Sequence, residues 1–329
     1  MACCKSIIGG DTLSKTISKE EYKSIKKKYH KRDWQRNWQV YLMFLPLAVY
    51  FIIFNYIPMV GILVAFEDYS VADGFFGSTW VGWQNFITLF TGDEFLIALR
   101  NTACMAVINL VLGFLPPVIL AILFSECHWK PFRRTAQLVS YMPNFVSSVV
   151  VCALVVEFFG VSGAITKLLT LLGLPEQNWL ANTQIPVFWL IYAAIGIWMG
   201  SGFGSVIYTS TISGVNGDLK EAAALDGAGR WQRVWYIVVP QLLPLCMINL
   251  TLAVGTMFMA GWDKVLLLYM PKTYDVSDVL YTYTYRMAFG SSVNYGLSTA
   301  SGLFQSVLGT TLLLISNKLN KKLTSYSLF

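Results

Sequence analysis

Charged side chains and histidine are scarce in this chain, and both shortages exclude functions. Only 13% of the 329 residues are Asp, Glu, Lys or Arg, and the two histidines, His30 and His128, lie far apart. The six cysteines contain no C-x-x-C pair. Zinc sites need Cys and His at short spacings, and disulfide-stapled domains need a denser set of cysteines. The sequence therefore predicts no metal site and no disulfide framework.

Catalytic and nucleotide-binding motifs are also missing. The chain has no G-x-x-x-x-G-K-[ST] to hold ATP phosphates, no H-E-x-x-H and no G-x-S-x-G. The glycine-rich run from Gly200 to Gly204 lies inside an apolar stretch with no preceding strand. We interpret this run as small residues that let helices pack closely. We expect a chain that is not an enzyme and binds no cofactor itself.

The first 38 residues show no signal peptide, because they contain no apolar stretch. Residues 1–38 form a basic tail in which lysines and arginines are interleaved with Tyr29, Trp34 and Trp38. Nucleic-acid binding is one interpretation of such a segment. The sequence favours another: a cytoplasmic segment beside a lipid bilayer, with cations near anionic headgroups and tryptophans at the boundary. We therefore expect no nucleic-acid partner.

Hydrophobic residues, by contrast, make up 55% of the chain. They gather in six runs, each long enough to cross a hydrocarbon core of about 30 Å. The runs lie near residues 40–63, 102–124, 138–160, 186–208, 237–260 and 300–317. We predict an all-α polytopic membrane protein with six transmembrane helices. Its membrane domain covers 39–322, and a short C-terminal tail covers 323–329.

The placement of lysine and arginine predicts an orientation. With the N-terminus in the cytoplasm, 19 of the 24 basic residues fall on cytoplasmic segments and five fall on outer segments. Cytoplasmic loops of membrane proteins carry such an excess. An even number of spans also returns the C-terminus to the cytoplasm. We expect a multi-pass protein of the plasma membrane with both termini inside the cell.

The segment 218–244 differs from the apolar runs on either side of it. Strong helix formers fill its first half, and Asp218 stands three residues before Glu221, which is a capping-box spacing. Gly227 and Gly229 are expected to end this short helix, because glycine accepts the left-handed conformation found at helix C-termini. The sequence predicts a short helix outside the membrane at this place.

A second short amphipathic piece is predicted over Arg230–Tyr236, and a membrane span is predicted to begin at Ile237. Together the two pieces form a helical elbow that projects from the cytoplasmic face of the membrane. Small side chains such as Ala222 and Ala223 permit the backbone of another protein to approach closely. We therefore interpret the elbow as a docking site.

The spacing of the elbow resembles the EAA loop, which marks the membrane subunits of binding-protein-dependent ABC importers. An E-A-A triplet at 221–223 is followed by three residues and Gly227. Nine further residues lead to the I-V-V-P sequence of Ile237–Pro240, where the usual pattern is I-x-L-P. Residues 40–66, Trp80–Phe86 and Asn294–Gly309 resemble the carbohydrate permeases, and among these the permeases for complex saccharides.

This resemblance implies the type I ABC importer permease fold and ATP-driven import of oligosaccharides into a bacterial cell. It implies that the segment 213–236 contacts a separate nucleotide-binding subunit, which uses ATP and Mg. A second homologous permease subunit and an extracellular solute-binding protein are the other implied partners. The residues with an implied role in coupling to the ATPase are Asp218, Glu221, Ala222, Ala223, Asp226, Gly227, Gly229, Arg230 and Pro240.

Polar residues in or near the spans are candidates for a substrate pathway, because such groups are costly in a membrane. Amides, carboxylates and flat aromatic faces suit sugar hydroxyls and rings. The candidates are Asn144, Glu157, Asn249, Trp262 and Asp263. Other roles stay open: the asparagines can bond between helices, Glu157 can reach the outer headgroups, and Asp263 can cap a helix or pair with Arg286.

Two alternative functions remain at this point. One is a secondary transporter or channel driven by an ion gradient, against which the spans contain few ionisable groups. The other is an ABC importer permease for another solute class, such as amino acids or phosphate. An aromatic content of 15% favours saccharides.

Overall fold

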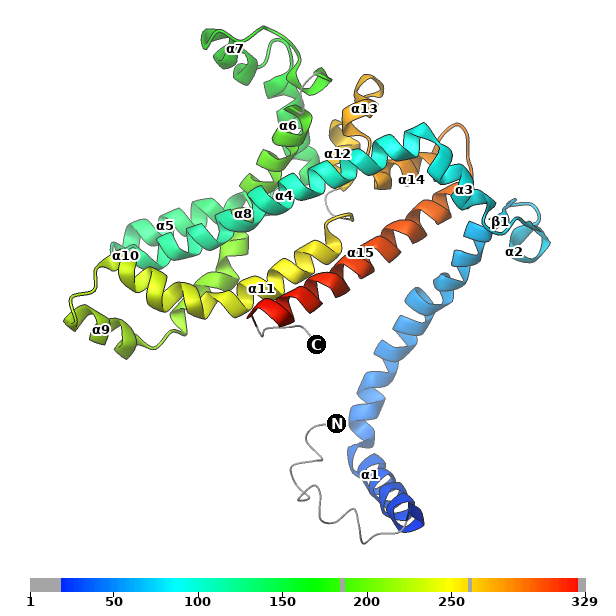
Figure 1. Ribbon diagram of the computed structural model, residues 1–329, viewed down its shortest axis with the longest axis horizontal. Helices are drawn as coiled ribbons and strands as arrows, with labels where there is room; N and C mark the ends of the chain where they lie inside the picture. Colours follow the sequence, from blue (N-terminus) through cyan, green and yellow to red (C-terminus); the bar gives the residue numbers. More distant parts are fainter. Residues whose placement is uncertain (1–18, 184–186, 260–261, 325–329) are drawn as a thin grey trace. The chain divides into compact units, whose positions relative to one another are not determined.

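The computed structural model describes residues 19–183, 187–259 and 262–324 (Figure 1). The chain divides into two units, Met1–Gly61 and Ile62–Phe329. Residues 1–18 of the predicted basic tail lie outside the described residues, as does most of the predicted C-terminal tail.

The first unit is helical from Lys19 onwards. Helix α1, Lys19–Phe51, leaves helical angles at Asn37, with φ −114° and ψ 17°. The part of the predicted basic tail that the structure describes, from Lys19, is therefore helical. The kink lies one residue before the predicted end of that tail. A π-helical turn, Ile52–Tyr56, and a 3₁₀ helix, Ile57–Phe66, continue the chain beyond α1.

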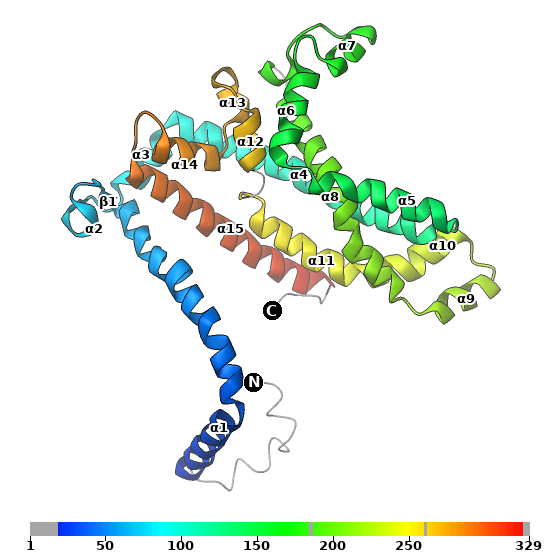
Figure 2. The ribbon, with the colours of Figure 1, turned by 180° about the vertical axis from the view of Figure 1, so that it is seen from behind.

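The second unit consists of helices joined by short connections, with one two-stranded antiparallel ribbon in which Glu67 pairs with Trp80. Its elements are β1 (Glu67–Asp68), α2 (Gly74–Gly77), β2 (Thr79–Trp80), α3 (Gln84–Thr91), α4 (Asp93–Glu126), α5 (Lys130–Tyr141), α6 (Ser148–Phe159), α7 (Ala164–Leu171), α8 (Val187–Ser213), α9 (Gly217–Leu225), α10 (Arg230–Arg233), α11 (Val239–Thr256), α12 (Trp262–Leu268), α13 (Tyr274–Ser277), α14 (Leu280–Phe289) and α15 (Tyr295–Thr324). Within this unit α9 and α10 lie at one end, and α12, α13 and α14 lie at the other (Figure 2).

Six helical stretches among the described residues are long and apolar enough to cross a membrane, as predicted. They are Trp34–Phe66, Asp93–Glu126, Ser148–Leu171, Val187–Ser213, Arg230–Thr256 and Tyr295–Lys322. The predicted third span, 138–160, is wrong in its extent. Its helix breaks after Tyr141, and α6 starts anew at Ser148 because the Ser147 hydroxyl caps it by accepting a hydrogen bond from the Val149 amide, 3.3 Å away.

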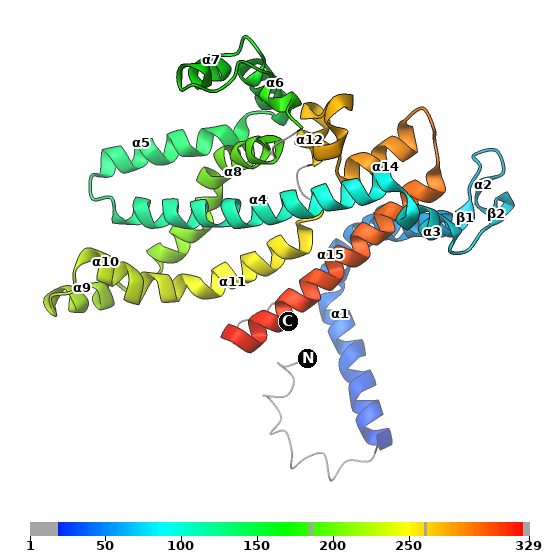
Figure 3. The same ribbon diagram turned by 45° about the horizontal axis from the view of Figure 1, so that its top comes forward.

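The core of the second unit is built along α4. This helix packs lengthwise against α8, while α11 packs against α15 and α14 against α15 (Figures 1 and 3). One apolar cluster joins α4 to α6, α8 and α12, and a second joins α4 to α3, α14 and α15. A third cluster joins α4 to α8 and α11 nearer the elbow. The long α4 helix therefore positions both ends of the unit.

Glycines allow the closest helix crossings. A β-carbon on Gly202 of α8 would collide with the backbone carbonyl of Ser140 in α5, and one on Gly204 would lie 3.4 Å from Pro117 in α4. A β-carbon on Gly255 of α11 would lie 2.6 Å from the Leu313 side chain in α15. The interpretation of Gly200–Gly204 as a close-packing surface is confirmed for Gly202 and Gly204, whereas Gly200 faces open space.

An ion cluster with one buried carboxylate links α14 to α4. The Arg286 guanidinium donates to Asp278 Oδ2 at 2.9 Å and to Glu94 Oε2 at 3.0 Å. Asp278 also accepts a hydrogen bond of 2.7 Å from the Thr282 hydroxyl. Burial raises the pKa of the Asp278 carboxyl, while Thr282 and Arg286 act in the opposite direction. The prediction that Asp263 can pair with Arg286 is wrong, because Asp278 and Glu94 occupy that role.

Candidate functional site

The predicted elbow begins with the short helix α9. Its N-cap is Asn216, whose side-chain oxygen accepts a hydrogen bond of 2.9 Å from the Asp218 amide. The predicted cap at Asp218 is therefore wrong by two residues. Asp218 lies in the first turn instead, where its negative charge interacts favourably with the positive end of the helix dipole.

The turn after α9 is a Schellman motif. The Ala228 amide donates to the Ala223 carbonyl at 2.9 Å, and the Gly227 amide donates to the Ala224 carbonyl at 3.1 Å. Gly227 has φ +79°, a left-handed conformation that favours glycine, as predicted. Gly229 does not end α9: it is extended and caps the next helix, and its amide donates to the Gln232 side chain at 2.6 Å.

Helix α10 continues into the membrane-spanning helix without a break. A π-helical turn, Val234–Val238, joins α10 to α11, and the candidate span runs from Arg230 to Thr256. The predicted separate piece Arg230–Tyr236 is thus the first part of that span. Pro240 lies in the first turn of α11, and it has no amide to donate to the carbonyl four residues earlier, which belongs to the π-helical turn. The second half of the elbow and α11 are therefore parts of one continuous helical run.

The surface of α9 is exposed and partly apolar. No residue of α9 is buried, and the side chain of Leu225 is 89% exposed. Glu221 and Ala222 are exposed, whereas Ala223 is half-buried. Single exposed apolar residues are common on protein surfaces, so a docking role for this surface stays a prediction. Leu225 was not predicted from the sequence, although an apolar residue beside the E-A-A triplet is a visible signal.

Arg230 is turned toward α4 and its exit turn. Its guanidinium forms an ion pair of 3.3 Å with Glu126 and hydrogen-bonds to the Glu126 carbonyl and to His128 Nδ1. The last carbonyls of a helix have no partner within the helix, so a cation there can satisfy their hydrogen-bonding demand by donating to them. The cation also interacts favourably with the negative end of the helix dipole. Arg230 therefore fastens the elbow to the end of α4.

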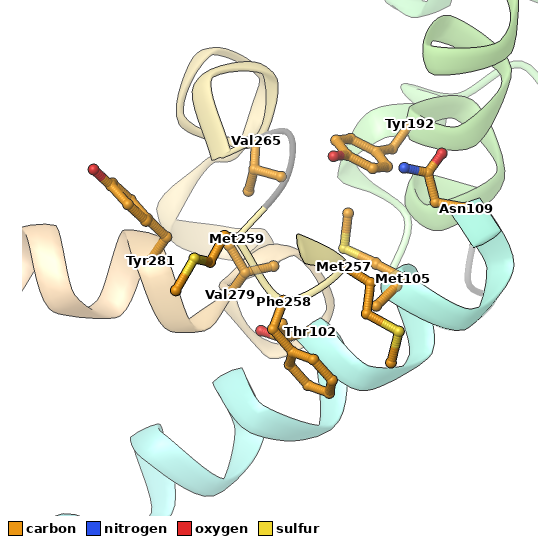
Figure 4. Close-up of a pocket in the computed structure, with 11 residues that line it drawn as sticks. Thr102, Met105, Asn109, Tyr192, Met257, Phe258, Met259, Val265, Val279 and Tyr281 are labelled. Carbon is orange, nitrogen blue, oxygen red and sulfur yellow. The ribbon is translucent and has the colours of Figure 1, made fainter. Parts of the chain in front are cut away.

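A cavity lies near the opposite end of the second unit (Figure 4). Residues of α4, α8, α12, the turn after α11 and the start of α14 line it: Thr102, Met105, Ala106, Asn109, Tyr192, Met257, Phe258, Met259, Val265, Val279 and Tyr281. Most of this lining is apolar. The Asn109 amide and the Tyr192 ring lie close together on one side of the cavity, as Figure 4 shows.

Of the predicted pathway residues whose side chains the structure describes, none lines this cavity. Asn144 is exposed in the 3₁₀ turn Met142–Phe145, and Glu157 is exposed on α6. The Asn249 amide donates to the Tyr208 hydroxyl at 3.2 Å and so bonds between α11 and α8, which was the other role left open for it. Asp263 is half-buried on α12, and the Trp262 side chain lies outside the described residues. A pathway role for these residues stays a prediction.

Three residues that were not predicted from the sequence lie together here. The position that a β-carbon would occupy on Gly196 lies 3.2 Å from Asn109 Oδ1 and 4.0 Å from Lys264 Nζ. Gly196 follows Tyr192 by one turn on the same face of α8. Asn109 was detectable as an amide in an apolar run, but Lys264 was indistinguishable from a surface lysine.

Comparison with known proteins identifies the family. A family model described as "Binding-protein-dependent transport system inner membrane component" matches residues 117–325, which is more than half of the chain. The chain belongs to this family of inner membrane transport components. Membership agrees with the predicted dependence on a solute-binding protein.

Individual relatives cover nearly the whole chain. It is 35% identical to the polygalacturonan/rhamnogalacturonan transport system permease protein YteP of Bacillus subtilis (strain 168), over 86% of this chain and 88% of that protein. It is also 35% identical to the protein LplB of the same strain, over 90% and 92% of the two chains.

A solved structure has the same fold. The crystal structure of a bacterial alginate ABC transporter, in complex with an alginate pentasaccharide-bound periplasmic protein, contains a chain that superposes with a TM-score of 0.82. That chain is 33% identical, and the match covers 90% of this chain and 99% of that one. The predicted type I importer permease fold with six membrane helices is confirmed.

Proposed function

We propose that this chain is one of two membrane subunits of an ATP-driven importer, and that the importer brings oligosaccharides into a bacterial cell. An extracellular solute-binding protein delivers the sugar. Separate nucleotide-binding subunits hydrolyse ATP with Mg, and this chain itself carries out no hydrolysis. The second membrane subunit is a homologous permease, since an ATPase dimer offers two docking grooves and this chain has one elbow.

The observation that carries this proposal is the agreement among relatives on a saccharide substrate. The relative YteP is named for transport of polygalacturonan and rhamnogalacturonan, and the structural neighbour belongs to an alginate transporter. Both similarities extend over more than four-fifths of this chain, at 35% and 33% identity. Substrate class is a property of the whole permease, so agreement over its full length is the relevant support.

The elbow end of the second unit faces the cytoplasm in this proposal, and both chain termini lie there. The lysine and arginine bias, 19 of 24 on that side, supports this orientation. There the exposed face of α9, with Glu221, Ala222 and Leu225, meets the nucleotide-binding subunit. Closure of the ATPase dimer displaces the elbow, and the continuous helix Arg230–Thr256 carries the displacement into the membrane. The elbow couples because its contacts differ between the two states of the importer.

Reconstitution tests the transport function. The complete importer is placed in proteoliposomes with its binding protein outside and ATP inside, and uptake of labelled oligosaccharides is measured. Accumulation that requires both ATP and the binding protein is the expected result. Uptake driven by an ion gradient without ATP, or uptake of amino acids or phosphate in place of sugars, contradicts the proposal.

The docking role of the elbow has a sharper test in Leu225. Burying a leucine side chain in an interface contributes about 1.5–3 kcal/mol, so Leu225→Asp is expected to weaken ATPase binding by about tenfold or more. The matched variant Leu225→Met keeps an apolar side chain and retains binding. Co-purification of the ATPase and sugar-stimulated ATP hydrolysis are the measurements. Normal binding and transport by a well-inserted Leu225→Asp variant rejects the docking role.

A further inference from the structure

Lys264 places a positive charge close to the cavity. It is half-buried on α12, next to the cavity residue Val265. Among the residues that the structure describes, no carboxylate lies within ion-pair distance of its ammonium group. Ionisable groups near membrane spans are default candidates for a substrate path, and Lys264 is such a group.

The ammonium group shares its space with an amide. Lys264 Nζ and Asn109 Oδ1 both approach the missing β-carbon of Gly196, at 4.0 Å and 3.2 Å. Among the described residues Asn109 forms no hydrogen bond, and its amide oxygen lies beside the same glycine as the lysine ammonium. The three residues come from α12, α4 and α8, and Gly196 provides the room between the other two.

We propose that Lys264 and Asn109 form a carboxylate-binding subsite beside the cavity, and that the oligosaccharides carried by this permease are acidic. This inference rests on the proposed function. A uronic acid residue carries one carboxylate on each sugar ring. Its oxygens accept from the lysine ammonium and from the asparagine amide at the short distances of charge-assisted hydrogen bonds. Alginate, which the similar transporter imports, is an acidic polysaccharide.

The neighbouring carboxylate of Asp263 sets the strength of this subsite. Asp263 forms no ion pair with Lys264 among the described residues, although its charge reaches Tyr192 of the cavity lining. Its negative charge nevertheless lowers the affinity for an anion. A transport path requires this balance, because a ligand must be bound well enough to enter and weakly enough to leave.

The test uses the reconstituted importer with its binding protein, trigalacturonate as the acidic probe and xylotriose as a neutral probe. Lys264→Gln is expected to reduce the initial rate of trigalacturonate uptake about tenfold at saturating binding protein, which is the effect of losing one charged hydrogen bond. Lys264→Arg keeps the positive charge and is expected to stay within about threefold of the wild type. Lys272→Gln is the matched control, because Lys272 is an exposed lysine of the same connecting segment.

A second variant covers the case in which Lys264→Gln does not accumulate in the membrane. Gly196→Ala places a methyl group between Asn109 and Lys264. It is expected to slow trigalacturonate uptake while the importer still assembles with its partners. Equal uptake by this variant and the wild type overturns the subsite.

The outcomes separate this inference from the function on which it rests. Equal trigalacturonate uptake by Lys264→Gln and the wild type overturns the subsite and leaves the importer function standing. Uptake of xylotriose but not of trigalacturonate by the wild type also overturns the subsite alone. Absence of ATP-dependent uptake of any oligosaccharide removes the proposed function itself.

Discussion

Replacing Arg286 by methionine is expected to destabilise the protein and to make its stability sensitive to pH. The Asp278 side chain is 3% exposed, and the variant leaves it with the Thr282 hydroxyl as its remaining partner in the cluster. Removing one partner of a buried ion pair costs about 3–5 kcal/mol. The Arg286 side chain is 22% exposed, so solvent offsets part of the loss, and we expect about 2–3 kcal/mol.

The direction of the pH effect follows from the pKa of Asp278. Burial already raises this pKa above its usual value, and loss of Arg286 raises it further. A carboxyl with a raised folded-state pKa stabilises the fold at low pH, and that stability is lost as the pH rises through the folded-state pKa. The deficit of Arg286→Met relative to the wild type is therefore expected to shrink on acidification, by at most about 1.4 kcal/mol per pH unit.

Thermal unfolding of the purified protein in nanodiscs, at pH 7.5 and pH 5.5, measures this difference. Glu94→Gln is the control, because the Glu94 side chain is 69% exposed and such a pair contributes about 0–1 kcal/mol. The double variant Arg286→Met/Asp278→Asn, which removes the buried charge, is expected to recover much of the loss. A deficit that is equal at both pH values, or a double variant no better than the single one, refutes the ion-pair reasoning.

Three further variants test packing and coupling. Gly202→Ala is expected to lower the yield of folded protein, because its methyl group meets the Ser140 carbonyl. The control Gly200→Ala on the same helix has open space and should fold normally. Equal yields of the two variants contradict the close crossing of α5 and α8. Gly227→Val forces a β-branched residue into a left-handed conformation at a cost of about 1–2 kcal/mol. The variant protein should insert in the membrane but lose sugar-stimulated ATP hydrolysis by the importer. Full stimulation of ATP hydrolysis contradicts the turn geometry. Arg230→Ala should change stability by less than about 1 kcal/mol, yet lower the ratio of sugar imported to ATP hydrolysed. An unchanged ratio shows that coupling does not depend on the ion pair between the elbow and α4.

Some of the site was predictable because its signals are local. The left-handed Gly227 follows from the spacing of the elbow, and the E-A-A triplet with that spacing is sufficient to indicate the correct family. The N-cap was predicted at Asp218 instead of Asn216, because both residue types cap helices and the spacing to Glu221 favoured the wrong one. Such errors stay within one helical turn.

The sequence by itself determined the number of membrane helices and the position of the elbow, because hydropathy and turn chemistry depend on neighbouring residues. Tertiary structure alone decided which distant residues meet. Arg286 pairs with Glu94, although 192 positions separate them in the sequence. Lys264 of α12 and Asn109 of α4 both lie beside Gly196 of α8. Helix packing sets these pairings through crossings such as that of Gly202 on Ser140, and no local pattern of residues encodes which helices will cross.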